Sequence, residues 1–354
     1  MDILNTITDL SHEFGIADYV LGGGGNTSCK NSSTLWVKPS GTTLADLEPE
    51  TFVALSRNQL ADLYKINPPA EASAREALVK DRMQNAVLTD AGRRASVEAP
   101  LHDSLSARYV VHTHPCLVNG MTCAMEGKAV CRELFPTALW LDYIDPGYTL
   151  CMEVRNEIQN YKDQNGREPS LIFLKNHGVF VAADEPDEIR KLYAEVMSML
   201  KASYDNAGVS LELDVGAKPE VDRIKAAESI IRDAIGMDDI SIASGGRFKP
   251  ASGPISPDHI VYAKSYPYIG TPTHKGIDDF KSKHGYIPQV IAFGDAVFGV
   301  SEEAKGASLA LQLAQDAALV EQLAEAFGGI DYMSEKAREF IENWEVESYR
   351  KKQM

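Results

Sequence analysis

The sequence predicts an α/β protein, because helical and strand patterns alternate along a chain whose composition suits a folded core. An apolar stripe at helical spacing marks residues 2–14, and short apolar runs at 35–38 and 171–174 are typical of buried strands. The chain has 354 residues, of which 44% are hydrophobic and 8% aromatic. A chain of this size and composition buries a full core, and its length predicts two domains rather than one.

The N-terminal elements follow from local spacing. The first helix carries four apolar residues on one face and ends at Gly15; these residues are Ile3, Ile7, Leu10 and Phe14. A glycine-rich turn then leads into a hairpin with its turn at 31–33 and its second strand at 35–38. Residues 70–89 have helical propensity, and they precede the stretch at 93–115 that carries the candidate site.

Later elements complete the alternation. The strand at 171–174 ends at the tetrapeptide KNHG, and a helix begins near Pro186 with an apolar stripe along one side. Residues 205–220 are polar and contain Gly and Pro, so the domain boundary is predicted near 212. The first domain would span 1–212 and the second, a smaller α/β domain, 213–354. The stretch from 302 to 350 is predominantly helical in pattern.

The second domain has the pattern of a degenerate repeat. Residues 288–304 follow the pattern of 169–185, and residues 256–267 follow that of 106–115. This alignment puts Tyr262 and Lys264 where His112 and His114 stand, and it leaves His177 without a counterpart. A second copy of this kind lacks the ligands for the same metal. A chance match of two short apolar strands is the alternative interpretation.

Charge and cysteine usage restrict the partners and the compartment. A formal net charge of −16 argues against nucleic acid or an anionic membrane as the main partner. No run of about 20 apolar residues is present, and the N-terminus lacks the features of a signal peptide. The five cysteines form no CxxC pair, so reduced thiols and a cytoplasmic location are expected. Cys116, close to a histidine pair, is a candidate ligand or nucleophile, with a buried thiol as the preferred interpretation.

The histidine pair at 112 and 114 is the strongest indication of chemistry. Side chains at i and i+2 of a strand leave the same face, so His112 and His114 can bind one metal ion, as in zinc sites. An ordinary strand with two partly exposed histidines is the alternative. His177 at the end of another strand and Glu98 before the histidine strand would complete a catalytic metal shell.

Glycines and short polar side chains form a second group. Gly22 to Gly25, followed by Asn26, Thr27 and Ser28, can expose backbone N–H groups to an oxyanion, with a flexible surface loop as the alternative. The run fits neither a dinucleotide fingerprint nor a P-loop, so no nucleotide cofactor is expected. Further donors of the kind that phosphate needs are Ser40, Gly41 and Ser96, and further positive charges are Lys38, Arg93 and Arg94.

Taken together, these segments resemble the class II aldolase and adducin-head family. The resemblance covers roughly residues 5–205 and rests on GNTS, the PSG turn, S-x-E with a histidine four residues later, HTHP and NHG, in that order. The longer aldolase modules fused to a dehydrogenase in some rhamnose-pathway proteins are the most similar members, although no dehydrogenase domain is expected here. The family often has two serines before the glutamate, whereas this chain has Val97 as the second.

The resemblance implies specific roles. His112, His114 and His177 would bind Zn²⁺ or another divalent metal, and Glu98 would be both the fourth ligand and the acid/base in turnover. The substrate phosphate would be held by Asn26, Ser28, Ser40, Gly41 and Ser96. His102 would be either a neighbour of the metal shell or a buried structural residue, and Tyr143 and Tyr148 lie where relatives carry a catalytic tyrosine.

The resemblance also implies a fold and a reaction. We expect a three-layer domain with a central, mainly antiparallel sheet flanked by helices, assembled as a homo-oligomer such as a tetramer. The expected reaction is zinc-dependent cleavage of a ketose 1-phosphate, such as rhamnulose or fuculose phosphate, to dihydroxyacetone phosphate and an aldehyde. The alternatives are epimerisation, decarboxylation or dehydration at the same metal site, and a non-catalytic adducin-like scaffold.

Overall fold

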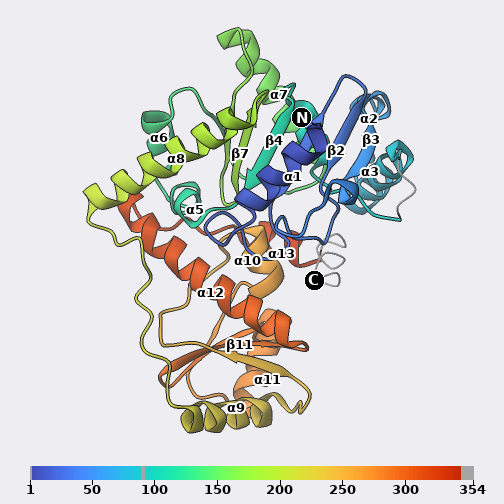
Figure 1. Ribbon diagram of the computed structural model, residues 1–354. Helices are drawn as coiled ribbons and strands as arrows, with labels where there is room; N and C mark the ends of the chain where they lie inside the picture. The colour runs from blue at the N-terminus through green and yellow to red at the C-terminus, as the bar shows by residue number, and fades with distance from the viewer. Residues whose placement is uncertain (1, 89–91, 344–354) are drawn as a thin grey trace. The chain divides into compact units, whose positions relative to one another are not determined.

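The computed structural model describes residues 2–88 and 92–343 (Figure 1). The described chain forms two compact units, one made of residues 2–118 and 128–200 and the other of residues 119–127 and 201–343. The predicted boundary near 212 lies about 12 residues after this division, which falls between residues 200 and 201. The short segment 119–127, which belongs to the second unit, is not apparent from sequence because it lies within the first predicted domain.

The first unit is built on one large sheet. Its strands are β1 (Asn26–Lys30), β2 (Thr34–Val37), β3 (Val53–Ser56), β4 (Tyr109–Thr113), β5 (Leu139–Leu141), β6 (Leu171–Leu174) and β7 (Gly178–Ala183). The seven strands lie in the order β3-β2-β1-β4-β7-β6-β5. All neighbouring pairs are antiparallel except β5 with β6. The expectation of a mainly antiparallel sheet is therefore confirmed.

Helices cover this sheet and connect its strands. They are α1 (Ile3–Phe14), the short η1 (Pro49–Thr51), α2 (Arg57–Leu63), α3 (Ala72–Ala86), α4 (Ala99–Ser104), α5 (Cys116–Thr122), α6 (Gly127–Leu134), α7 (Tyr148–Asn165) and α8 (Pro186–Ala207). The predicted helices at 2–14, at 70–89 and after Pro186 correspond to α1, α3 and α8. Asp2 caps α1 by accepting a hydrogen bond from the backbone N–H of Leu4.

Alternation along β4 assigns its side chains to two layers. Val110 packs with residues of α4 and α7 on one face of the sheet. Thr113 faces the opposite layer, where its Oγ1 lies 2.8 Å from the hydroxyl of Tyr193 on α8, whose ring packs against Phe14 of α1. Because His112 shares its face with Val110, the candidate metal ligand lies on the α4 and α7 side.

The second unit has a smaller sheet of four strands. They are β8 (Ser241–Ser244), β9 (Tyr268–Ile269), β10 (Val290–Phe293) and β11 (Ala296–Ser301), in the order β8-β11-β10-β9. The helices are α9 (Val221–Ile235), α10 (Pro257–Ala263), α11 (His274–His284), α12 (Ala304–Ala324), the short η2 (Glu325–Phe327) and α13 (Glu335–Asn343). The helices α12, η2 and α13 agree with the helical pattern predicted from 302 onward, as far as the described residues extend.

The second unit repeats half of the first sheet. The strand sets β4-β7-β6-β5 and β8-β11-β10-β9 have the same order, and corresponding neighbours run in the same relative directions. The hairpin formed by β10 and β11 corresponds to the one formed by β6 and β7, as the sequence pattern indicates. In each repeat a helix crosses between the two parallel strands, α7 in the first and α11 in the second.

One part of the predicted repeat is wrong. Residues 257–263 form helix α10 rather than a strand, so Tyr262 and Lys264 do not correspond to the two histidines. The strand β8 takes the place of β4 instead. Ser244 pairs with Phe298 just as His112 pairs with Phe180. A short apolar run fits a buried strand and a buried helix equally well. Pro257 at the start of this run favours the helix.

None of the helices in the described ranges is long and apolar enough to span a lipid bilayer.

Candidate metal centre

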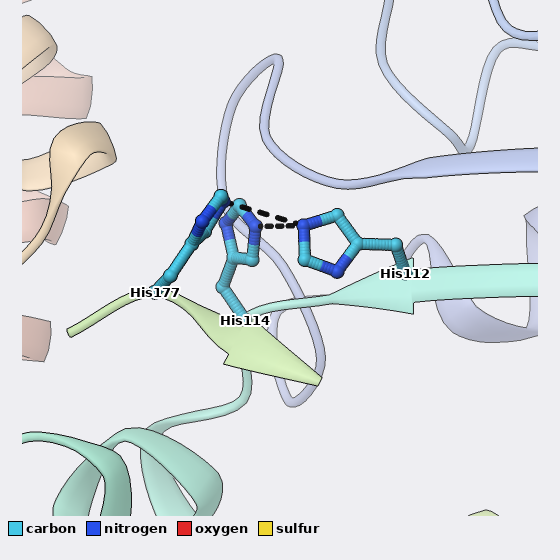
Figure 2. A group of neighbouring side chains, drawn as sticks. All are labelled: His112, His114 and His177. Atoms are coloured by element: carbon cyan, nitrogen blue, oxygen red, sulfur yellow. Dashed lines mark hydrogen bonds between the residues drawn. The ribbon is translucent and has the colours of Figure 1, made fainter. Parts of the chain in front are cut away.

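Three imidazoles converge at one edge of the large sheet (Figure 2). His112 is the last residue but one of β4, His114 follows the strand directly, and His177 lies in the turn between β6 and β7. Their Nε2 atoms face one another, with 2.9 Å from His112 to His114 and 3.4 Å from His112 to His177. The three rings offer donor atoms that all lie within 4.8 Å of one another.

The Glu98 carboxylate lies against the same cluster. Its Oε2 is 3.7 Å from His112 Nε2, and its Oε1 is 3.6 Å from His177 Nε2. Glu98 is the N-cap residue of α4 and is 9% exposed, so the carboxylate lies inside the protein and not on its surface. The four residues predicted to form the metal shell are therefore adjacent in space.

The donor set fits a tetrahedral divalent metal. Nitrogen and oxygen ligands at about 2.0–2.2 Å from zinc lie about 3.3–3.6 Å from one another in a tetrahedron, and the observed separations centre on this value. The Nδ1 atom of His112 is 2.9 Å from the carbonyl oxygen of Val179, to which it donates, so Nε2 carries the lone pair. Lone pairs that face each other are stabilised by a shared cation.

Local backbone geometry explains the NHG motif. Asn176 adopts a left-handed conformation with φ of 53°, which Asn tolerates better than most residues. Gly178 follows His177 directly, and a Cβ there would lie 2.4 Å from the Thr113 carbonyl oxygen and 2.6 Å from His114 Cδ2. Only glycine therefore lets the β7 backbone pass against the His114 ring.

The glycine run is shaped by the same strand. Gly25 has φ of +60°, and a Cβ there would lie 2.7 Å from the carbonyl oxygen of His112. The residue that follows, Asn26, is paired with His112 in the register of β1 and β4. Because Gly25 has no side chain, the loop can pass close to β4, and Asn26 then pairs with His112 next to the candidate site.

A buried chain of hydrogen bonds supports Glu98. Asn26 Nδ2 donates to Glu98 Oε2 at 2.5 Å, and Asn26 Oδ1 accepts from His102 Nε2. His102 Nδ1 in turn accepts from the Ser28 hydroxyl at 2.7 Å. His102 and Ser28 are completely buried. These hydrogen bonds fix the orientation of the Asn26 amide, since only its nitrogen can donate to a carboxylate.

The environment keeps the carboxylate ionised and His102 neutral. Burial raises the pKa of Glu98, but His112, His177 and the hydrogen bond from Asn26 outweigh it and lower this pKa to about 2. Burial also lowers the pKa of His102 to about 3, against the opposing charge of Glu98. At neutral pH, Glu98 can therefore act as an anionic ligand or as a proton acceptor.

The remaining candidate phosphate ligands lie close to this chain. The backbone N–H of Ser40 donates to the Arg94 carbonyl at 2.8 Å, which places the turn of Ser40 and Gly41 next to the segment before Ser96. Ser96 Oγ is 3.4 Å from Asn26 Nδ2. The buried Lys38 reaches the glycine run, with its Nζ 3.3 Å from the carbonyl oxygen of Gly23.

Two contacts of the site were not predicted from the sequence. Asn26 and Ser28 were assigned only to phosphate, whereas their side chains contact Glu98 and His102. The register of β1 against β4 would have indicated the first contact, but strand pairing is not evident from the chain alone. Tyr148, a candidate catalytic tyrosine, is buried, and its hydroxyl donates to the Leu63 carbonyl at 3.4 Å.

Comparison with known proteins gives one family. The model of the class II aldolase and adducin N-terminal domain matches residues 5–204, which contain every residue of the candidate centre.

Among individual proteins, an uncharacterized oxidoreductase of Bacillus subtilis, YuxG, is 24% identical over 391 residues. The match covers 93% of this chain and 55% of that protein, so the chain spans about half the length of this relative. The solved N-terminal class II aldolase domain of a conserved Thermoplasma acidophilum protein is 24% identical, with a TM-score of 0.49, covering 57% of this chain and 93% of that one. A solved L-fuculose 1-phosphate aldolase is 15% identical, with a TM-score of 0.40, covering 58% and 86%.

Proposed function

We propose that this chain, which belongs to the class II aldolase and adducin N-terminal domain family, is a zinc-dependent aldolase that acts on a ketose 1-phosphate. Its products would be dihydroxyacetone phosphate and an aldehyde, and its substrate a 6-deoxyhexulose 1-phosphate such as rhamnulose or fuculose phosphate. One observation carries the proposal, namely the convergence of Glu98 with three histidines at the edge of the sheet.

Cleavage of a carbon–carbon bond next to a carbonyl needs a site that accepts electrons and a group that accepts a proton. A divalent metal held by His112, His114 and His177 would supply Lewis-acid chemistry at the substrate oxygens. Glu98 would take the proton from the hydroxyl whose carbon–carbon bond breaks. Burial raises the pKa of this carboxylate, so a Glu98 that remains inside the protein without a cationic partner is a stronger base.

The phosphate of the substrate would lie among the glycine run, the turn of Ser40 and Gly41, and Ser96. Backbone N–H groups and hydroxyls are the donors that a phosphate dianion requires, and Lys38 brings a positive charge to this region. Asn26 and Ser28 belong to the same proposed phosphate site. Their contacts with Glu98 and His102 would couple phosphate binding to the position of the carboxylate.

The same site serves other proposed outcomes. Epimerisation, decarboxylation and dehydration of a sugar phosphate need the same electron sink and differ in how the intermediate is protonated or released. A scaffold role in the manner of adducin needs no metal.

The five cysteines carry thiols, which supports the proposal that the protein works in the reducing cytoplasm. The family supports a homo-oligomer such as a tetramer.

Metal analysis combined with a substrate panel tests the proposal. The purified protein is expected to bind one zinc per chain and to release an aldehyde from rhamnulose 1-phosphate or fuculose 1-phosphate. A chelator should abolish the release, and added zinc should restore it. Release of an epimer, carbon dioxide or water from other sugar phosphates would favour the alternative enzymes. Protein without bound metal and without activity on the panel would favour the scaffold.

A further inference from the structure

The second unit contains a large cavity of about 1210 Å³. Its walls come from six separate stretches of this unit, including the segments that follow β8, β9 and β10. Ligand pockets for small molecules typically enclose about 300–1,000 Å³, so this cavity has room for a ligand of metabolite size with bound water. No residue of the candidate metal centre lines it.

The cavity lies at the place in the repeat that corresponds to the metal centre. In the first unit, His114 and His177 follow the carboxyl ends of β4 and β6. In the second unit, the cavity is lined by Arg247 beyond β8 and by Gly294 beyond β10. The carboxyl ends of parallel strands are where open α/β sheets bind ligands. The second copy therefore keeps the position of a site but not its metal ligands.

Two cations of the cavity wall are available to a ligand. Arg247 and Lys283 are exposed, and neither forms an ion pair within the described part of the chain. The other cations are already neutralised, since Lys249 pairs with Glu321 at 3.0 Å and Arg338 with Glu335 at 2.8 Å. Asp214, a carboxylate of the same wall, forms no ion pair among the described residues either, so the unpaired side chains of the wall carry two positive charges and one negative charge. In a chain with a net charge of −16, this local excess of positive charge indicates an anionic ligand.

Rings and apolar side chains form the rest of the wall. The rings of His284 and Tyr266 contact each other at an angle of 34°, with centroids 4.5 Å apart, and both line the cavity. Phe248 and Phe293 add apolar side chains to the wall of the same cavity. Burial and the charges of Lys283 and Arg338 lower the pKa of His284, so its ring is neutral at neutral pH and can face a sugar or a base.

We propose that this cavity is a second binding site, which takes a phosphorylated small molecule built on a sugar ring. Arg247 and Lys283 bind the phosphate, and the surface formed by Tyr266, His284 and Phe293 holds the ring. A free sugar phosphate and a nucleotide share this chemistry. Among the described residues that line it, no carboxylate lies next to a cluster of histidines, so the metal shell of the first unit is not repeated here.

The experiment uses the full chain and three probes, namely inorganic phosphate, ribose 5-phosphate and AMP. Calorimetry gives the affinity, and hydrogen–deuterium exchange locates the binding. Protection of residues 247–252 and 283–294 by ribose 5-phosphate or AMP is expected, and the tighter of the two identifies the ligand class. Inorganic phosphate is expected to bind more weakly, because it leaves the ring surface uncovered.

A charge-removing double variant decides the role of the two cations. Arg247→Gln with Lys283→Gln should weaken binding of the tighter probe at least about tenfold, or about 1.4 kcal/mol, because the charge-assisted hydrogen bonds to the phosphate are lost. The matched control, Lys225→Gln with Lys305→Gln, removes the same charge from exposed positions outside this cavity and should bind normally. The melting temperature of both variants shows that they are folded.

Three results would overturn the proposal. The first is protection confined to the glycine run and the segments around Ser40 and Ser96, which would place all binding at the metal centre. The second is protection at 247–252 and 283–294 that the double variant leaves unchanged. The third is equal affinity for all three probes, which would show that the ring of the ligand does not contribute to binding. None of these results bears on cleavage at the metal centre, which the aldehyde assay measures separately.

Discussion

Asn26 holds Glu98 through a hydrogen bond of 2.5 Å, and the same amide accepts a hydrogen bond from His102. The carboxylate that faces the three histidines is thus held from behind by a residue of β1, which pairs directly with the strand of His112. Position and charge of Glu98 depend on this amide, because the donor both orients the carboxylate and lowers its pKa.

Replacement of Glu98 by Gln should separate metal binding from proton transfer. The three histidines remain, so most of the metal should stay bound, while loss of the proton acceptor should lower kcat by about 10²–10⁴. Metal content and aldehyde release are the measurements. Glu153→Gln on the exposed face of α7 is the matched control. Full cleavage activity in E98Q with zinc bound would refute the assigned role.

Replacement of Asn26 by Asp tests the support of Glu98. The new carboxylate would still accept from His102 but would repel Glu98, so N26D should be less active than N26A. Loss of such a supporting contact typically costs about 10–100-fold in metal affinity or activity.

The chain offers a matched control for this change. Asn160 Nδ2 donates to Glu157 at 3.1 Å on the exposed surface of α7, and N160D alters the same kind of pair away from the site. N160D should keep normal metal affinity and kcat. A variant N26D that is as active as N26A would show that Asn26 does not act through the charge of Glu98.

Replacement of Gly178 by Ala should displace His114. The added methyl group would lie 2.6 Å from His114 Cδ2, which is closer than carbon atoms approach without a shift. We expect weaker zinc binding, measured by competition with a chromogenic chelator, together with a lower melting temperature. Gly216→Ala, where the nearest atom is 3.4 Å away, is the control. Unchanged zinc affinity in G178A would contradict the close packing of Gly178 on the ring.

Lys30 should make the free energy of unfolding depend on pH between neutral and alkaline values. Its Nζ is buried and donates to the carbonyls of Leu105 and Ala107, and burial lowers its pKa from 10.5 to about 7. Between these two pKa values the unfolded chain binds a proton that the folded chain lacks. The contribution of Lys30 to the free energy of unfolding therefore increases as the pH rises through this range and decreases as the pH falls.

The measurement is urea unfolding of the wild type and Lys30→Met between pH 7 and 10.5. The difference in unfolding free energy between the two proteins should shift in favour of the wild type as the pH rises. Subtraction of the variant cancels the buried thiols, such as Cys29, whose raised pKa acts in the opposite direction. A difference that stays constant with pH would show that Lys30 titrates normally.

The sequence indicates the histidine pair directly, whereas the residues that support Glu98 are not evident from it. The spacing of His112 and His114 indicates one strand face directly, because strand periodicity is local. The partners of Asn26 follow from the register of β1 on β4, which depends on strands that are distant in the chain. The contact of Ser28 with His102 depends on how α4 packs on β1, so it is not evident from the sequence either.

The repeat shows the same limit. The hairpin of β10 and β11 was predicted because it is local, and its two-residue turn at 294–295 is marked by Gly294 with φ of 62°. The stretch at 256–267 was misassigned because a short apolar run fits a buried strand or a buried helix equally well. Only the pairing of Ser244 with Phe298 reveals which strand corresponds to β4.

The pairing of Asn26 with His112 also has a consequence for the maturation of the proposed metal site. Glu98 and the three histidines come from segments that are distant in the sequence and that meet when the sheet has formed, so the complete set of proposed ligands belongs to the folded chain. A hydrogen bond between protein atoms holds Glu98 there. If zinc binds at this site as proposed, we expect it to enter and leave a chain that stays folded, and protein stripped of the ion should regain it on mixing, with no refolding step.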